Sequence, residues 1–459
     1  MTNLWVLTEE KPKRSVVKDI LVKYSEEYNK SLEFDLNGEF SIVPIFKDKK
    51  YTFTCEVYGI TIEDVGGIYI KTVSGSSSFV DYLLIEQEEE PKDGEMTNLI
   101  MAFEETKTSD EESRNTGVYQ RGTKFAFLRG YSKSVKMYML YNDELNTSET
   151  KKPSNTNLFG TNMLLTLGVD IMGKNNLSWF KKFDTLDEFI EAKNSMKRPP
   201  KGNVPILINR YDDRIEVSGR LSKPANRGNI GHDPNIGALS LISTCIRKMG
   251  WDKRIVIISH GVSQEYVDRK RVKNKFLYMC KLYNVELDGI NMPEDYKLPE
   301  KYWHYEKGSE KVTSIMLHIL AENKNIDEVY QNHAGCERGY FYTKNRVPIT
   351  LPKKDSTGLI NLFIPDLILY DSASNTILLI EAKRLYTLKA GLKEIKHYDS
   401  IEREYIDKFY PNSKKLRYLT LFGGNKVALP HKQVLVYMNL DGTIFVNPDA
   451  PNFIKNLFE

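Results

Sequence analysis

The sequence predicts a mixed α/β fold, because helix-like and strand-like segments alternate along most of the chain. Apolar residues recur at helical spacing over 17–24 and again over 312–320. Apolar runs rich in β-branched and aromatic residues, such as 40–46, 51–58 and 361–370, are typical of strands. In the last third of the chain the predicted order is helix, three strands, helix, strand.

The first part of the chain combines one helix with a series of strands. After the helix around 17–24, strands are predicted over 40–46, 51–58, 67–71, 80–86 and 99–105, followed by a helix over 113–128 and a strand over 135–140. The polar loop 87–98 joins the strands 80–86 and 99–105. These two strands are therefore expected to form an antiparallel hairpin.

A chain of 459 residues is too long for one typical core, which indicates two or three domains. Three stretches have the composition of linkers: 146–160 is rich in Asn, Ser and Thr, 196–202 contains two prolines, and 291–299 is punctuated by Pro. We expect an α/β domain over 1–150, a connecting α/β region over 151–295, and a second α/β domain over 296–459.

The last third gives the clearest pattern. Ser309 and Glu310 are expected to begin a helix. Strands are predicted at about 339–343, 361–370 and 376–382, then a long charged helix over about 387–409, and finally strands at 416–421 and 433–438.

Composition sets broad limits on function. Hydrophobic residues make up 41% and charged residues 28% of the chain, the balance of a soluble globular protein. No apolar run has the roughly 18 residues of a membrane helix, and the N-terminus lacks the pattern of a secretory signal, so a cytoplasmic protein is expected. The formal net charge of +3 neither requires nor excludes nucleic acid. The four cysteines lack zinc-site spacing.

The strongest indication of a functional site is the pair Pro365-Asp366 followed by Glu381-Ala-Lys383. Asp366 is early on one apolar strand and Glu381 is late on the next, with a turn of Ser and Asn between them. In an antiparallel hairpin those two ends lie side by side. Lys383 is two residues beyond Glu381 and is expected on the same face.

Two carboxylates and a lysine on one sheet edge suit hydrolysis of a phosphodiester. Carboxylate oxygens are ligands for a hard cation such as Mg²⁺, with Mn²⁺ able to substitute. A bound cation polarises the phosphoryl oxygen and lowers the pKa of a water, while the lysine orients that water and offsets negative charge. The alternative is structural: a turn-forming Asp and an ordinary charged strand end.

These residues and the α-β-β-β-α-β order resemble the PD-(D/E)xK nuclease superfamily, to which many type II restriction endonucleases belong. The resemblance implies a restriction-endonuclease-like core and a Mg²⁺-dependent endonuclease acting on double-stranded DNA. It also implies a metal-supporting Glu from the helix before the first strand, for which Glu310 is the candidate. A cognate DNA methyltransferase is expected in the same system, although not as a stable subunit.

A second, similar arrangement lies in the first part of the chain. Asp81 on one strand of the predicted hairpin, with Glu105 and Lys107 on the other, again gives two carboxylates and a lysine. No proline precedes this Asp, and the intervening loop is longer. The nuclease core is therefore predicted twice. The alternative is a solvated run of charges.

The segment after this second arrangement is polar and basic. Arg114, Asn115 and Gln120, together with Tyr119 and Lys124, are expected behind the site, close to backbone phosphates. The middle of the chain carries a second candidate DNA-binding stretch, because Arg and Asn suit the edges of guanine and adenine and Gly-rich backbone approaches phosphates closely. Its candidate residues, besides Arg214, are Arg220, Lys223, Asn226, Arg227, Asn229 and His232. A basic surface loop without base contacts is the alternative.

The sequence thus predicts a sequence-specific, Mg²⁺-dependent DNA endonuclease of the restriction type. If both sites are catalytic, each can cut one strand of an asymmetric sequence; otherwise one site is degenerate and only binds DNA. Two other functions stay open: a repair or transposition nuclease of the same fold, and a non-catalytic DNA-binding protein with relic nuclease folds.

Overall fold

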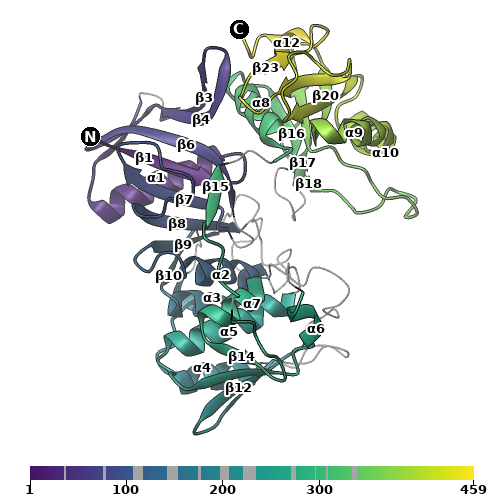
Figure 1. Ribbon diagram of the computed structural model, residues 1–459. Helices are drawn as coiled ribbons and strands as arrows, with labels where there is room; N and C mark the ends of the chain where they lie inside the picture. The colour runs from purple at the N-terminus through teal and green to yellow at the C-terminus, as the bar shows by residue number, and fades with distance from the viewer. Residues whose placement is uncertain are drawn as a thin grey trace. The chain divides into compact units, whose positions relative to one another are not determined.

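The computed structural model describes residues 1–35, 38–75, 79–106, 117–141, 154–173, 177–196, 206–220, 234–269, 275–294, 296–305, 309–332 and 339–459 (Figure 1). Contacts divide the chain into two compact units. The first comprises Met1–Ser74, Glu86–Pro91 and His304–Glu459, and the second comprises Gly75–Ile85 and Lys92–Trp303.

Helices and several mixed sheets occur in the described structure, which confirms the predicted mixed α/β class. The division into three domains at 150 and 295 stays a prediction. Within the described ranges, every helix is too short or too polar to cross a membrane.

The first unit opens with one helix and a set of mainly antiparallel strands. Parallel pairing joins β1 to β6, and antiparallel pairing joins β6 to β4 and β4 to β3. Helix α1 buries an apolar stripe of five residues, as its spacing predicts. The elements are β1 Thr2–Thr8, α1 Arg14–Tyr28, β2 Leu32–Phe34, β3 Ser41–Lys47, β4 Lys50–Tyr58, β5 Ile60–Ile62 and β6 Val65–Gly75.

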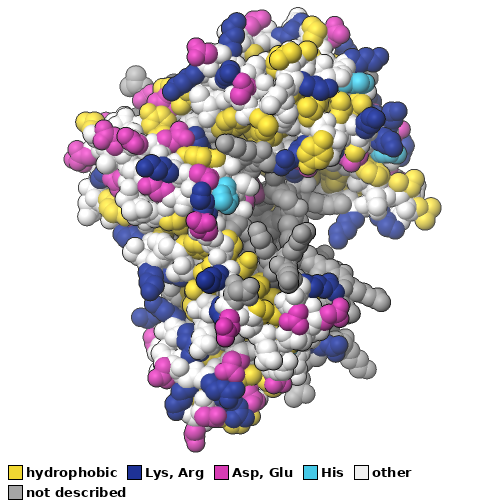
Figure 2. Space-filling model, viewed as in Figure 1, with side chains coloured by type: hydrophobic (Ala, Val, Ile, Leu, Met, Phe, Trp, Pro, Cys, Tyr) yellow, Lys and Arg dark blue, Asp and Glu magenta, His cyan; other side chains and the backbone are white. Residues whose placement is uncertain are grey.

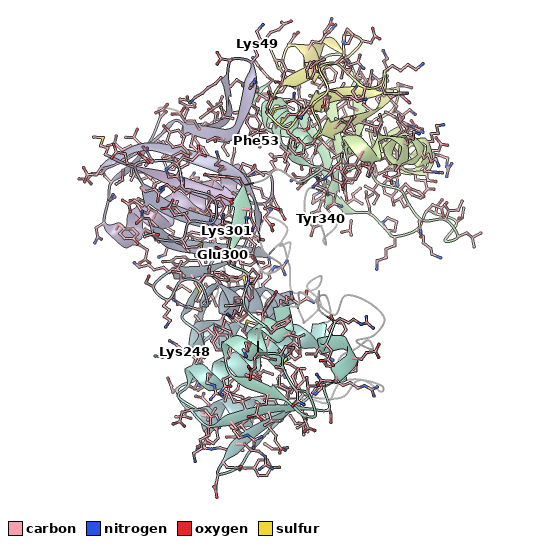
Figure 3. The ribbon with its side chains drawn as sticks, viewed as in Figure 1. Lys49, Phe53, Lys248, Glu300, Lys301 and Tyr340 are labelled. Carbon is pink, nitrogen blue, oxygen red and sulfur yellow. The ribbon has the colours of Figure 1, made fainter. Side chains whose placement is uncertain are left out.

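The turn between β3 and β4 shows how local chemistry sets the pairing. Asp48 and Lys49, the latter labelled in Figure 3, have φ angles of 50° and 63°. Two successive left-handed residues form the kind of two-residue turn that matches the twist of a hairpin. Lys47 and Lys50 are paired across it, and Lys50 forms an ion pair with Asp441 at 2.7 Å.

The C-terminal part of the first unit contains a six-stranded mixed sheet in the order β16-β19-β20-β21-β22-β23. The elements are α8 Val312–Asn323, β16 Asp327–Gln331, β17 Tyr340–Tyr342, β18 Pro348–Thr350, β19 Leu367–Asp371, β20 Thr376–Arg384, η4 Leu385–Thr387, α9 Leu388–Glu394, η5 Ile395–His397, α10 Asp399–Ile401, η6 Glu402–Ile406, α11 Asp407–Phe409, β21 Lys414–Phe422, β22 Val434–Met438, β23 Ile444–Val446 and α12 Asn452–Lys455.

One of the three strands predicted before the charged helix does not belong to the main sheet. The segment predicted at 339–343 is β17, which pairs with β18 in a separate two-stranded sheet (Tyr340 is labelled in Figure 3). Instead β16 pairs antiparallel with β19 in the main sheet. Strand β16 has the sequence Asp-Glu-Val-Tyr-Gln and lies at the edge of the sheet. Edge strands are often short and polar, so β16 lacks the apolar run that is typical of a central strand.

Strands β19 and β20 are antiparallel, whereas β20 and β21 are parallel. Parallel neighbours need a crossover connection, and the helical segment 385–409 supplies it. The predicted continuous helix is broken into short α and 3-10 pieces and one π-helical turn. Its inner face buries Ile395, Tyr398 and Ile401 in the core that also contains Leu379 and Leu419.

The strands of the second unit are hydrogen-bonded in the orders β7-β8-β9-β10 and β11-β12-β13-β14. The predicted hairpin is present as the antiparallel pair β7–β8, and β9 joins β8 in parallel after the crossover helix α2. The elements are β7 Tyr82–Gln87, β8 Leu99–Thr106, α2 Gly117–Leu128, β9 Lys136–Tyr141, α3 Asn155–Thr166, β10 Val169–Met172, η1 Leu177–Trp179, α4 Leu186–Asn194, β11 Leu207–Arg210, β12 Arg214–Ser218, α5 Pro234–Lys248, β13 Arg254–Ile258, α6 Gln264–Val267, α7 Lys275–Leu282 and β14 Val285–Leu287. Strand β15, Trp303–Tyr305, begins at the last residue of the second unit and continues into the first.

Candidate functional site

The β19–β20 hairpin brings Asp366 and Glu381 together. Leu367 is paired with Ile380, so the next pair in the same register sets Asp366 opposite Glu381. The amide of Ala382 donates a hydrogen bond to Asp366 Oδ2 at 3.0 Å, which fixes the carboxylate at the end of the neighbouring strand. The backbone of Asp366 is held as well, because the amide of Asn332 donates to its carbonyl oxygen at 2.7 Å.

Lys383 lies on the same face of β20 as Glu381. Its Nζ is 2.7 Å from Glu381 Oε1 and 2.6 Å from Glu394 Oε2 on α9. Gly391 of α9 makes room for the lysine stem, since a Cβ there would come within 2.7 Å of Lys383 Cγ. The strand pattern predicts Lys383 but not Glu394 and Gly391, which come from the crossover segment.

Tyr398 completes the surroundings of Glu381. This buried tyrosine lies between η5 and α10, and its hydroxyl donates a hydrogen bond to Glu381 Oε2. Both carboxylate oxygens of Glu381 are therefore engaged, one by Lys383 and the other by Tyr398. The crossover segment thus holds the end of β20 from two points, Glu394 and Tyr398.

The electrostatics of this centre are strongly perturbed. Burial, and after it the negative charge of Asp366, raises the pKa of Glu381 to about 8, against the opposing effect of Lys383. Burial lowers the pKa of Lys383, but Glu381 and Glu394 outweigh it and raise that pKa above its ordinary value. A like-charge carboxylate pair beside a lysine in a buried setting is the kind of perturbation that concentrates at functional sites.

The start of α8 contributes a lysine where a glutamate was expected. Lys311 Nζ is 3.2 Å from Asp366 Oδ1 and donates to the carbonyl oxygen of Asn332 at 2.6 Å. Glu310 lies in the turn that precedes α8, and among the contacts of the described residues it is Lys311 that reaches Asp366. The helix begins at Val312, later than predicted, so a different residue faces the hairpin.

In the β7–β8 hairpin of the second unit an aspartate again lies opposite a glutamate, but the glutamate is not the predicted one. Tyr82 is paired with Phe103, so the register sets Asp81 opposite Glu104. The amide of Asp81 donates to Glu104 Oε2 at 3.0 Å, and the amide of Glu105 donates to Asp81 Oδ2 at 2.8 Å. Because successive strand residues point to opposite faces, Glu104 rather than the predicted Glu105 shares a face with Asp81.

The lysine of this second centre comes from helix α2. Lys124 Nζ is 2.6 Å from Glu104 Oε1 and 3.1 Å from Asp81 Oδ1. Arg121, one turn earlier, has its Nε 3.7 Å from Glu104 Oε1 and donates to the carbonyl oxygen of Glu105 at 3.1 Å. The predicted Lys107 lies outside the described residues.

Burial and charge act here as they do in the first unit. Burial, and after it the charge of Asp81, raises the pKa of Glu104 well above its ordinary value. Burial opposes the charge on Asp81, but Lys124 and Arg121 outweigh it and lower the pKa of this carboxyl. The pKa of Lys124 is raised in turn by Asp81 and Glu104, although burial lowers it.

The candidate DNA-binding residues are only partly within the described structure. Gln120 is half-buried on α2, and Arg220 is exposed just beyond β12. Seven others lie outside the described residues: Arg114, Asn115, Lys223, Asn226, Arg227, Asn229 and His232.

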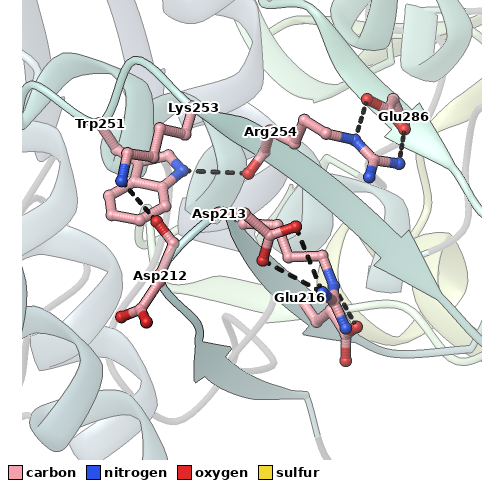
Figure 4. Close-up of polar contacts among 8 residues, drawn as sticks. Asp212, Asp213, Glu216, Trp251, Lys253, Arg254 and Glu286 are labelled. Carbon is pink, nitrogen blue, oxygen red and sulfur yellow. Dashed lines mark hydrogen bonds and ion pairs between the residues drawn. The ribbon is translucent and has the colours of Figure 1, made fainter.

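The described arginines near the middle stretch are engaged by acidic neighbours. Arg214 Nη1 is 3.1 Å from Asp213 Oδ1, and its Nε is 2.8 Å from Glu216 Oε1 (Figure 4). Arg254 Nη2 is 2.7 Å from Glu286 Oε2 on the neighbouring strand β14 (Figure 4). On the face drawn in Figure 2, basic side chains are likewise interspersed with acidic ones. These two arginines are therefore better explained by the stability of the sheet than by DNA contact.

Comparison of the chain with protein-family models, with curated proteins and with solved structures gives no match. The assignment of a function therefore depends on the chemistry and geometry of the two hairpin centres.

Proposed function

We propose that the chain is a sequence-specific, Mg²⁺-dependent endonuclease of the restriction type that hydrolyses double-stranded DNA. The observation that carries this proposal is the pair formed by the partly buried Asp366 and the buried Glu381, placed opposite each other across a hairpin with Lys383 on the same strand face. The order α8, β16, β19, β20, crossover helices and β21 supports it, because this is the α-β-β-β-α-β order that the resemblance implies.

The donor set of this centre fits Mg²⁺. Asp366 and Glu381 offer hard oxygen ligands, and Mg²⁺ is commonly held by one or two carboxylates while it keeps several waters. Among the described residues, no group of three or more His, Cys, Asp or Glu side chains is placed to hold a metal, so an all-protein cage is not the arrangement found. A divalent cation would offset the repulsion that contributes to the raised pKa of Glu381.

When bound, Mg²⁺ would supply a polarised phosphoryl oxygen and a more acidic water. The side chains of the centre then have distinct roles. Asp366 and Glu381 would hold the cation, Tyr398 and the Ala382 amide fix the two carboxylates, and Lys383 would orient the attacking water. The water oxygen bonds to phosphorus while the bond from phosphorus to one sugar oxygen breaks; the water releases a proton to solvent, and the departing oxygen takes one up.

The direct experiment is digestion of a plasmid of known sequence with Mg²⁺ and, in parallel, with a chelator. The proposal predicts discrete fragments with Mg²⁺ and intact plasmid with chelator. Cleavage only at lesions or at transposon ends would instead indicate a repair or transposition nuclease. Binding of the duplex with no cleavage would indicate a DNA-binding protein with relic nuclease folds.

Mg²⁺ affinity at this centre should depend on pH. Only the ionised form of Glu381 binds the cation, and its pKa is raised to about 8. Below pH 8 the apparent affinity should therefore rise about tenfold per pH unit, and above pH 8 it should level off. The Mg²⁺ concentration that half-saturates a thermal stabilisation, measured from pH 6 to 9, checks this. A curve that is flat over that range would contradict it.

Tyr398→Phe should change this pH profile without removing a metal ligand. The hydroxyl stabilises the ionised form of Glu381, so its loss should raise the pKa of Glu381 further. At pH 7 the apparent Mg²⁺ affinity should fall about tenfold, the equivalent of one hydrogen bond to a charged group. Above pH 9 the difference should shrink.

A matched control for Tyr398→Phe is Tyr405→Phe, which alters a tyrosine of the same crossover segment that packs against Phe341. The control should leave the pH profile unchanged. An equal loss of affinity at every pH in Tyr398→Phe would show that the residue acts on folding rather than on Glu381.

A further inference from the structure

The second unit carries a centre that the sequence pattern alone misassigns. We propose that Asp81, Glu104 and Lys124 form a second phosphodiester-hydrolysing centre, in which the lysine is supplied by the crossover helix α2 instead of the strand. This inference rests on the function proposed for the Asp366 centre and deepens it. Its substrate is the same duplex DNA, with one strand cut at each centre.

The two hairpins share the same register around their carboxylates. In each hairpin the aspartate directly precedes the first strand and lies opposite a glutamate near the end of the second strand. The residue after that glutamate donates its amide to the aspartate Oδ2 in both cases, at 2.8 Å from Glu105 and 3.0 Å from Ala382. One coincidence of residue types is common in a long chain, but a shared register with a shared backbone hydrogen bond is a more specific match.

Each hairpin is followed by the same kind of connection, a helical crossover to a parallel strand. Strand β8 is followed by α2 and then by β9, which pairs with β8 in parallel. Strand β20 is followed by the crossover helices and then by β21, which pairs with β20 in parallel. In both units, therefore, a crossover segment lies next to the strand that carries the glutamate and can bring a side chain to it.

A lysine lies beside the glutamate in both centres, although it comes from a different element in each. Thr106 stands two residues beyond Glu104, where Lys383 stands beyond Glu381. Lys124 compensates for this difference, because its Nζ approaches Glu104 Oε1 at 2.6 Å, compared with 2.7 Å between Lys383 and Glu381. The same pair of charges is thus assembled with the lysine anchored on the helix.

Burial also distinguishes this centre. The Glu104 side chain is 2% exposed and the Asp81 side chain 23%, and Lys124 and Arg121 are the compensating cations. A buried carboxylate beside a second, partly buried one carries a desolvation cost that an apolar residue at the end of the strand would avoid. The arrangement is explained if the two carboxylates bind a divalent cation, which in turn binds a phosphate oxygen of the DNA.

The test compares Glu104→Gln with Glu191→Gln, which changes an exposed glutamate of helix α4, on supercoiled plasmid in Mg²⁺. Both changes keep the shape of the side chain. Glu104→Gln should stop at nicked circles, whereas Glu191→Gln should linearise the plasmid as the wild type does. Sequencing from the nick should locate it on the strand opposite to the one nicked by Glu381→Gln.

Each contrary result has a distinct meaning. Linearisation by Glu104→Gln at the wild-type rate would overturn the second centre while leaving the Asp366 centre intact. Loss of nicking as well, in a variant with a wild-type circular dichroism spectrum, would overturn the division of one strand per centre. A wild type that leaves plasmid intact in Mg²⁺ would overturn the proposed function itself.

A binding measurement tests the second centre without cleavage. Titration with Mn²⁺, followed by the signal of the free ion in electron paramagnetic resonance, should give two strong sites in the wild type. Glu104→Gln and Glu381→Gln should each retain one. A single site in the wild type, or a site count unchanged by Glu104→Gln, would overturn the proposal.

Discussion

Lys383→Ala is expected to lower the rate of cleavage at the Asp366–Glu381 centre by about 10²–10⁴-fold, the range for loss of a group that assists proton transfer. The lysine Nζ bridges Glu381 and Glu394, so its removal leaves both carboxylates without their nearest cation. On supercoiled plasmid the product should be the nicked circle, because the Asp81–Glu104 centre still cuts one strand. The measurement is the ratio of nicked to linear plasmid over time.

The matched control for this variant is Lys389→Ala, which removes an exposed lysine from the neighbouring helix α9. It should linearise plasmid as the wild type does. If Lys383→Ala also linearises plasmid at the wild-type rate, Lys383 has no part in the reaction. If both variants lose linearisation of the plasmid to the same extent, the cause is a disturbed fold of the crossover segment and not the chemistry of the centre.

Glu381→Gln is expected to abolish cleavage at the same centre and, in metal-free buffer, to stabilise the protein at alkaline pH. The folded state raises the pKa of Glu381 from 4.5 to about 8, so it retains a proton that the unfolded chain releases. Stability therefore falls as pH rises from about 4.5 to about 8 and stays low above that window. Glutamine carries no such proton, so at pH 9 the variant should have a higher Tm than the wild type.

When the two Tm values are compared at pH 9 in the presence of Mg²⁺, the wild type should have the higher one. The cation binds the folded wild type and raises its Tm by mass action, whereas the variant lacks a ligand and should respond less. A Glu381→Gln variant that is less stable than the wild type at pH 9 without metal would show that the glutamate serves the fold. That result would favour the structural interpretation of the strand end over a metal centre.

The C-terminal centre was largely predictable because its residues lie on one hairpin. Two apolar strands around a short turn determine which ends meet, and alternation determines which residues share a face. The proximity of Asp366, Glu381 and Lys383 can therefore be predicted from their spacing alone. The positions of Glu394, Tyr398 and Lys311 cannot be predicted in this way, because these residues reach the centre through tertiary packing. The segments that carry them have the sequence patterns of ordinary charged helices.

The second centre shows where spacing misleads. Glu105 and Lys107 reproduce the Glu-x-Lys spacing of β20, yet the strand register selects Glu104. The hairpin loop is long, and a register shift between Leu84 and Ile85 changes the pairing by one position. A one-residue change reverses every face, and no local signal in the sequence specifies it. Lys124 was expected near this site from its place in the sequence, but its contact with Glu104 follows only from the packing of α2 on β8.

The central claim is that Asp366 and Glu381 form a cation-dependent centre that hydrolyses DNA. The most direct test is the initial rate of cleavage of a mapped plasmid in Mg²⁺ by the wild type and by Asp366→Asn, which keeps an acceptor for the Ala382 amide. We predict site-specific double-strand breaks by the wild type and none by Asp366→Asn. Equal rates of linearisation by the two folded proteins would contradict the claim.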